Sequence, residues 1–165
     1  MSSAQVHSVQ RLADFKAVLQ TFADRGKDAM SACAMEIRRA QDWLESQLGF
    51  WRAEIRRAED AVHAAKTDLQ RKKMMRISDR QPDTTDQEKA LGKAQARLDH
   101  AEEKQKNVKA WMQQLPRAIE EYDGQARPFQ DVLDHDLVKM IALLEYKIAA
   151  LDEYQRIQAN AGGMP

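Results

Sequence analysis

Two histidines and the acidic residues near them are the side chains of this chain best suited to metal chemistry. His63 has Glu59 nearby, and His100 lies beside Asp99 and Glu102. Two imidazoles and a carboxylate form a ligand set for zinc or another transition metal. Neither histidine follows a Glu by three residues, the spacing of metal sites in helix bundles, and neither lies on the apolar helix stripe described below. We therefore predict solvated histidines, with no metal and no cofactor.

The residues suited to nucleophilic or acid–base catalysis do not converge. Cys33 is the single cysteine, so it forms no disulfide within the chain, and no histidine near it suggests a nucleophile pair. Its place on the apolar stripe predicts a small buried hydrophobe. The acids Glu102–Glu103 and Glu120–Glu121 are adjacent, so on a helix they point about 100° apart. No phosphate loop, dinucleotide fingerprint or metalloprotease motif is present. We predict that the chain is not an enzyme and has no catalytic residues.

A basic cluster precedes the clearest break in the helical pattern, and it comprises Arg71, Lys72, Lys73, Arg76 and Arg80. This basic tip could bind phosphate groups or an acidic protein surface. Alternatively, its cations stabilise the C-terminal end of a helix dipole and keep an exposed tip soluble. No aromatic residue is interleaved with them, unlike in many surfaces that bind single-stranded nucleic acid. Nucleic acid therefore ranks below protein as the expected partner.

Composition and charge restrict the class of protein. The chain has 165 residues, with 26 basic and 26 acidic side chains and a net charge of zero. No bulk charge draws it to nucleic acid or to an anionic membrane. The N-terminus lacks the basic and apolar regions of a signal peptide, and no apolar run approaches the roughly 18 residues that span a bilayer. We expect a cytoplasmic protein without a transmembrane segment, while export by a leaderless route stays open.

Apolar and small residues recur every three or four positions, which is typical of amphipathic helices in a coiled coil. Glycine (6) and proline (4) are scarce, and no proline interrupts a first helix predicted over 8–77. Gly26 is the weak point of that helix. Its stripe comprises Leu12, Phe15, Leu19, Phe22, Gly26, Ala29, Cys33, Ile37, Ala40, Leu44, Leu48, Trp51, Ile55, Ala58, Val62, Ala65 and Leu69.

Pro82 and its polar neighbours predict a turn over 78–85. Thr85 and Glu88 fit a capping box at the start of a second helix, predicted over 86–123. The stripe of this helix comprises Leu91, Ala94, Leu98, Ala101, Gln105, Val108, Met112, Leu115, Ile119 and Tyr122.

Gly124 and Pro128 predict a break over 124–128. A C-terminal helical segment follows over 129–159, and the acidic stretch Asp134–Asp136 is a candidate for a further break. A flexible tail is predicted over 160–165, and residues 1–165 are expected to form a single helical domain. The third stripe comprises Phe129, Leu133, Leu137, Met140, Leu144, Ile148, Leu151 and Gln155.

Folding the chain at the turn pairs the first two stripes, so we predict an all-α, elongated antiparallel helical hairpin or coiled coil with an additional C-terminal helical segment. The predicted register places Ala58 opposite Ala101 and Trp51 opposite Met112. Two arrangements are open for the C-terminal segment. It either lies alongside residues 8–36, or it folds back on the middle of the hairpin and forms a three-helix bundle region.

Large apolar residues beyond the stripes are the candidates for partner binding, since aromatic side chains anchor protein interfaces. Trp51 and Trp111 are expected to be internal. The candidate partner-binding residues are Trp43, Phe50, Leu143, Tyr146 and Tyr154.

The sequence therefore favours a non-enzymatic structural or adaptor protein, a spacer or assembly subunit that acts through protein–protein contacts. Its expected partners are helical proteins or further copies of the chain in a homo-oligomer. The alternative function is a binding module whose basic tip engages nucleic acid or another anionic surface.

Overall fold

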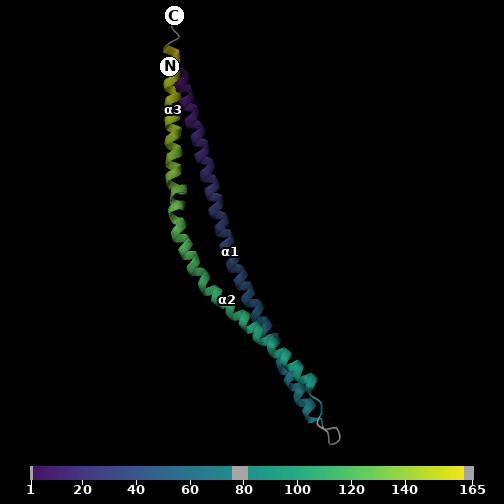
Figure 1. Ribbon diagram of the computed structural model, residues 1–165. Helices are drawn as coiled ribbons and strands as arrows, with labels where there is room; N and C mark the ends of the chain where they lie inside the picture. The colour runs from purple at the N-terminus through teal and green to yellow at the C-terminus, as the bar shows by residue number, and fades with distance from the viewer. Residues whose placement is uncertain (1, 76–81, 162–165) are drawn as a thin grey trace. The chain divides into compact units, whose positions relative to one another are not determined.

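The computed structural model describes residues 2–75 and 82–161, with side chains from residue 8 onward. Helix α1 covers Ser2–Met74 and helix α2 covers Thr85–Asp131. A short π-helix, η1, follows at Val132–Asp136, and α3 covers Leu137–Ala161 (Figure 1). Within the described residues there is no β-strand. The predicted all-α helical hairpin is confirmed.

The predicted helix boundaries need three corrections. Helix α1 begins at Ser2 rather than at residue 8, and it ends at Met74, before the predicted end at residue 77, which lies outside the described residues. The predicted tail began at residue 160, but α3 continues to Ala161, and the remaining tail residues are not described. The predicted break over 124–128 is wrong, because α2 runs through it to Asp131.

Pro128 does not end α2, and neither does Pro116, which lies inside the same helix. A proline in a helix removes the N–H that would bond the carbonyl four residues earlier, and its ring crowds that carbonyl. The seam packing of half-buried Tyr122 and buried Leu133, on either side of Pro128, outweighs this local cost. The irregularity comes later, as the π-turn η1, and includes the acidic stretch that was the further candidate break.

The start of α2 is capped one position earlier than predicted. The Glu88 backbone N–H donates to the Thr84 carbonyl oxygen (2.9 Å), and the Thr84 hydroxyl donates to the Glu88 carboxylate (3.0 Å). Asp83 accepts hydrogen bonds from the Thr85 hydroxyl (2.7 Å) and backbone N–H (3.0 Å). These two bonds, the hydroxyl first, hold the pKa of Asp83 below its ordinary value. A charged cap stabilises the exposed N–H groups of a first helical turn.

Contacts within the chain divide it into two units. The hairpin unit, Ile37–Ile119, contains the end of α1 and the start of α2. In it, every predicted stripe position of both helices is buried or half-buried. Five are buried, and they form a thin core of small and medium side chains: Leu44, Ala58, Val62, Ala101 and Val108.

The predicted register of the hairpin unit is wrong, although the stripes are right. The indole of Trp51 lies against the imidazole of His100, with ring centroids 6.0 Å apart. The prediction had placed Trp51 opposite Met112, about three turns further along α2. An ion pair between Glu54 and Arg97 lies at the same level as the Trp51–His100 contact.

The terminal unit, Met1–Glu36 with Glu120–Pro165, pairs the start of α1 with the end of α2, η1 and α3 (Figure 1). Leu19, Ala23, Met30, Leu133 and Leu137 pack in its core. Two ion pairs cross between the helices: Lys16 Nζ with Glu145 Oε1 (3.3 Å), and Lys27 Nζ with Asp134 Oδ1 (3.9 Å). Ascending numbers in α1 meet descending numbers opposite, so the pairing is antiparallel. Of the two predicted arrangements, the contacts show the C-terminal segment alongside residues 8–36.

Gly26 is a point of close packing rather than a weak point. A Cβ atom built on it would lie 2.6 Å from Leu133 Cδ2 and 3.3 Å from Phe129 Cζ. Leu133 is only 1% exposed, so it has little room to move away. The missing side chain therefore lets α1 and the opposite helix approach each other at this level.

We expect Gly26→Ala to lower the free energy of unfolding by about 1 kcal/mol, because overpacking a filled site outweighs the gain in helix propensity. Gly49→Ala is the matched control, since nothing lies within 4 Å of a Cβ at that position. It should raise the free energy of unfolding by roughly 0.5–1 kcal/mol. Urea unfolding followed by circular dichroism measures both variants. Equal stabilisation by the two substitutions would contradict the close packing at Gly26.

Candidate partner-binding site

An apolar groove of about 670 Å³ runs between α1 and α2 in the hairpin unit. We call it the tryptophan groove. Its walls contain all three tryptophans of the chain, together with three polar residues and four aliphatic ones. The lining residues are Ala40, Trp43, Leu44, Gln47 and Trp51 of α1, and Lys104, Asn107, Val108, Trp111 and Leu115 of α2.

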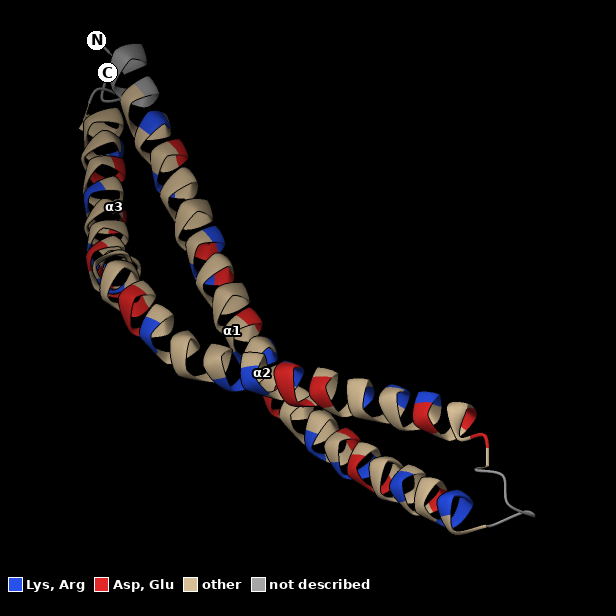
Figure 2. Ribbon diagram, turned by 60° about the horizontal axis from the view of Figure 1, so that its bottom comes forward, with Lys and Arg blue, Asp and Glu red and all other residues tan. Residues whose placement is uncertain are grey.

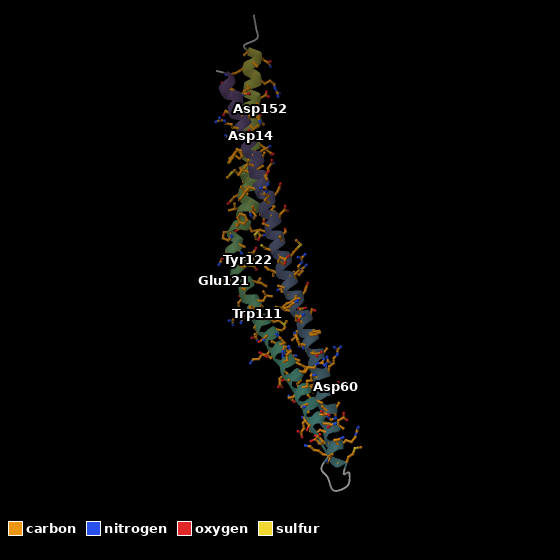
Figure 3. The ribbon with its side chains drawn as sticks, turned by 45° about the vertical axis from the view of Figure 1, so that its right-hand side comes forward. Asp14, Asp60, Trp111, Glu121, Tyr122 and Asp152 are labelled. Carbon is orange, nitrogen blue, oxygen red and sulfur yellow. The ribbon has the colours of Figure 1, made fainter. Side chains whose placement is uncertain are left out.

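Helix geometry explains why these residues face the same side. Trp43 directly precedes the buried Leu44, and Trp111 directly precedes Met112 of the α2 stripe. A residue one position before a stripe residue points about 100° away from the seam. When two right-handed helices run antiparallel, this preceding flank lies on the same face for both. Trp43 and Trp111 therefore converge on one groove, although they are far apart in the sequence (Trp111 is labelled in Figure 3).

The three tryptophans have different degrees of burial. Trp43 is 60% exposed and Trp111 is 62% exposed. Trp51 is half-buried and makes edge-to-face contacts with Phe50 (4.9 Å between centroids) and with His100. The prediction that Trp111 is internal is therefore wrong. Trp111 lies on the preceding flank, one position from the seam, where a two-helix structure has nothing to cover it.

The polar residues of the groove are hydrogen-bond donors set among indole rings. Lys104 contributes a cation, while Gln47 and Asn107 contribute amide groups. No acidic side chain is among the lining residues. The groove thus offers apolar surface for anchoring side chains and positive charge at its edge, which suits a ligand surface that is apolar with an adjacent carboxylate.

The other predicted partner-binding residues are exposed but do not line this groove. Phe50 is 51% exposed and packs edge-on against Trp51. Leu143 (56%), Tyr146 (68%) and Tyr154 (52%) lie on α3, in the terminal unit. The Tyr154 hydroxyl accepts a hydrogen bond from the Gln158 amide (2.8 Å), and Lys147 lies 6.0 Å from the Tyr146 ring centroid. Their role in binding stays a prediction.

Cys33 is exposed, so the prediction of a buried thiol is wrong. It lies within hydrogen-bonding reach of Tyr122 in the terminal unit (Tyr122 is labelled in Figure 3). The Tyr122 hydroxyl donates to the Met30 sulfur at 3.8 Å. A hydrogen bond with Cys33 is the main cause that raises the pKa of Tyr122, and desolvation adds to it. The half-buried ring of Tyr122 thus fills the place in the seam where we had expected the Cys33 thiol.

The histidines lie apart from any cluster of ligands. His63 is exposed, and His100 packs against Trp51. Among the described residues, no group of three or more His, Cys, Asp or Glu side chains is placed to hold a metal ion.

The basic tip is described only in part. Arg71, Lys72 and Lys73 lie in the last turn of α1, whereas the predicted tip residues Arg76 and Arg80 lie outside the described residues. Arg71 forms an ion pair with Asp68 (3.5 Å between Nη1 and Oδ1). Acidic residues also gather at the facing start of α2, including Asp86 and Glu88 (Figure 2). The described part of the tip therefore carries both signs of charge.

Comparison with protein-family models, with curated proteins and with solved structures gives no match for this chain. The interpretation of its surfaces therefore rests on its own residues. None of the helices in the described part of the chain is both long and apolar enough to cross a membrane.

We expect the tryptophans to separate into one that supports the fold and two that belong to the surface. Trp51→Ala should lower the free energy of unfolding by about 2 kcal/mol, since a half-buried indole is removed from the seam. Trp43→Ala and Trp111→Ala should each change it by no more than about 0.5 kcal/mol. Chemical unfolding of the three variants measures this. A cost for Trp111→Ala equal to that for Trp51→Ala would place Trp111 in the core after all.

Proposed function

We propose that this chain is a non-enzymatic structural or adaptor protein that acts through protein–protein contacts, and that the tryptophan groove receives a helix of a partner protein. The observation that supports this is the exposure of Trp43 and Trp111 on opposite walls of one apolar groove. Large exposed apolar surfaces are uncommon on monomers, and tryptophan is among the residues that contribute most to interface affinity.

The shape of the groove favours a helical partner. It follows two antiparallel helices, so a third helix can lay its ridge of side chains along it, with anchors at every third or fourth residue. Lys104 lies on one wall, beside Asn107. An acidic residue next to the apolar anchors of the incoming helix would pair with this lysine. The partner we propose is thus an amphipathic helix with acidic residues flanking its apolar stripe.

The length of the helices supports a role as a spacer or assembly subunit. Helix α1 alone has 73 residues, a contour of about 110 Å at 1.5 Å per residue. The alternative function, binding of nucleic acid or another anionic surface by the basic tip, has weaker support. Asp68 pairs with Arg71, and the charge of Asp83 interacts with that of Lys72.

The test compares proteins recovered by crosslinking and affinity purification from the native cell, with the wild-type chain and with Trp43→Ser/Trp111→Ser as baits. We expect at least one protein recovered in constant ratio to the wild-type bait, and a loss of about tenfold or more with the double variant, since two anchors are removed. Met35→Ser is the matched control, because it removes a comparably exposed apolar side chain (57%) that lies outside the groove.

Two outcomes would contradict the proposal. The first is equal recovery of all proteins by the wild-type chain and the double variant. The second is recovery of nucleic acid that is released by salt and lost when Arg71, Lys72 and Lys73 are replaced by Gln, which would favour the alternative function. Circular dichroism of the double variant establishes that it keeps its helical content.

A further inference from the structure

A second apolar stripe runs along one flank of the C-terminal helical segment in the terminal unit. The observed seam here comprises Leu133, Leu137, Ile141, Leu144, Ile148 and Gln155. The prediction that Phe129, Met140 and Leu151 belong to the seam is therefore wrong. Each member of the second stripe precedes a seam position by one residue or by four and therefore lies on the preceding flank defined above. Its apolar members are between 38% and 56% exposed. In chain order the stripe comprises Phe129, Val132, Asp136, Met140, Leu143, Lys147, Leu151 and Tyr154.

Helix α1 contributes a matching stripe to the same face. Phe15, Val18 and Phe22 are 49%, 63% and 48% exposed, and they also lie on the preceding flank of the seam. Because the helices run antiparallel, the two preceding flanks lie on one side of the terminal unit. The edge-to-face contact of Phe22 with Phe129, at 6.2 Å between centroids, shows directly that the two stripes adjoin. We call this combined surface the terminal-unit face.

The area of this face is large for a surface left in water. A large side chain exposes about 200 Å² in full, so the nine apolar side chains at these exposures present about 800 Å². The largest apolar patch on a typical monomer is about 300–600 Å². A standard protein interface buries about 800 Å² on each partner. The face is therefore sufficient by itself for one stable interface.

The stripe on the C-terminal segment has the same order of spacings and of residue types when it is followed from either end. From Phe129 to Tyr154 the steps are 3, 4, 4, 3, 4, 4 and 3, with the midpoint between Met140 and Leu143. When the direction of the stripe is reversed, three of its four pairs exchange one apolar residue for another. The fourth pair exchanges Asp136 for Lys147, which carry opposite charges. A stripe with this symmetry is complementary to an antiparallel copy of itself.

We propose that the terminal-unit face binds a second copy of this chain about a two-fold axis near Met140 and Leu143. Each Met140 then packs against Leu143 of the other copy, and each Asp136 pairs with Lys147 of the other copy. An isologous contact of this kind uses the same patch twice and closes on itself. The zero net charge of the chain leaves no overall repulsion between copies.

The stripe on α1 extends the same face, and the contacts of Gly26 with Leu133 and of Phe22 with Phe129 place it beside the C-terminal segment. In the proposed dimer it packs against the α1 stripe of the other copy. Each helix then has antiparallel neighbours, which is the up-down-up-down four-helix bundle. Arg11 and Arg25 lie at the two ends of the α1 stripe. In the dimer these like charges lie at the solvated rim of the interface, where their repulsion costs little.

Sedimentation velocity over a range of concentrations tests the proposal, which rests on the proposed role as an assembly protein. The wild-type chain should be a dimer, and Leu143→Lys should make it a monomer with unchanged helical content. Asp136→Lys and Lys147→Asp should each weaken the dimer roughly tenfold or more, because each places like charges together twice. The double variant Asp136→Lys/Lys147→Asp should recover most of the affinity. Asp152→Lys is the matched control, since it makes the same change of charge as Asp136→Lys on the opposite flank of α3.

Cysteine crosslinking tests the direction of the pairing in a Cys33→Ser background. A mixture of Met140→Cys and Leu143→Cys chains should form disulfide-linked dimers faster than Leu143→Cys chains alone. The reverse order would indicate parallel pairing and overturn the proposed axis.

Three results of the sedimentation experiment would overturn self-pairing: a monomer at every concentration, a dimer that tolerates Leu143→Lys, or a double charge variant no tighter than the single ones. A further combination is a wild-type chain that sediments as a monomer while Trp43→Ser/Trp111→Ser still abolishes recovery of a partner protein. That combination would overturn the self-pairing alone and leave the proposed function unaffected.

Discussion

The physical constraint behind this structure is that two antiparallel helices share a single seam. Each helix can bury only one stripe, at every third or fourth residue. Among the described residues, only eight hydrophobic side chains are buried, and three of them are alanines. A buried Leu or Val contributes about 1.5–3 kcal/mol, so the core of each unit is small. Whatever apolar surface the chain carries beyond the stripe must lie on the flanks of the helices, in contact with water.

The stripe itself could be predicted from the sequence because periodicity reports directly on burial. In α2 the predicted positions from Leu91 to Tyr122 are all less exposed than their neighbours, and in α1 every predicted position from Ile37 to Leu69 is buried or half-buried. The prediction fails in the first part of α1, where Ala23 and Met30 lie in the seam in place of Phe22 and Ala29, and in α3, where Ile141 replaces Met140. In α1 the close approach at Gly26 is the reason. It leaves room for an alanine, and a phenylalanine is displaced to the flank.

The register and the breaks could not be predicted, since both depend on the partner helix. A seam built from repeating small and large residues accepts shifts by whole turns with similar packing, so the stripes alone do not place Trp51 opposite His100. The Gly124–Pro128 pair is a break signal in isolation. In the structure the helix continues, because the seam packing of Tyr122 and Leu133 on either side outweighs the local cost. Tertiary contacts commonly override such local preferences.

The flanks carry information that a search for stripes overlooks. In each unit, large apolar residues occupy the position directly before a seam residue, as Trp43 does before Leu44 and Leu143 does before Leu144. In an antiparallel pair the preceding flanks of both helices share one face, whereas the flanks after the seam share the other. In the terminal unit that other face carries the ion pairs of Lys16 with Glu145 and of Lys27 with Asp134. In the hairpin unit the Glu54–Arg97 ion pair lies instead on the same face as the tryptophans, because each of its residues directly precedes a seam residue. The division between an aromatic face and an ion-pair face is therefore a property of the terminal unit.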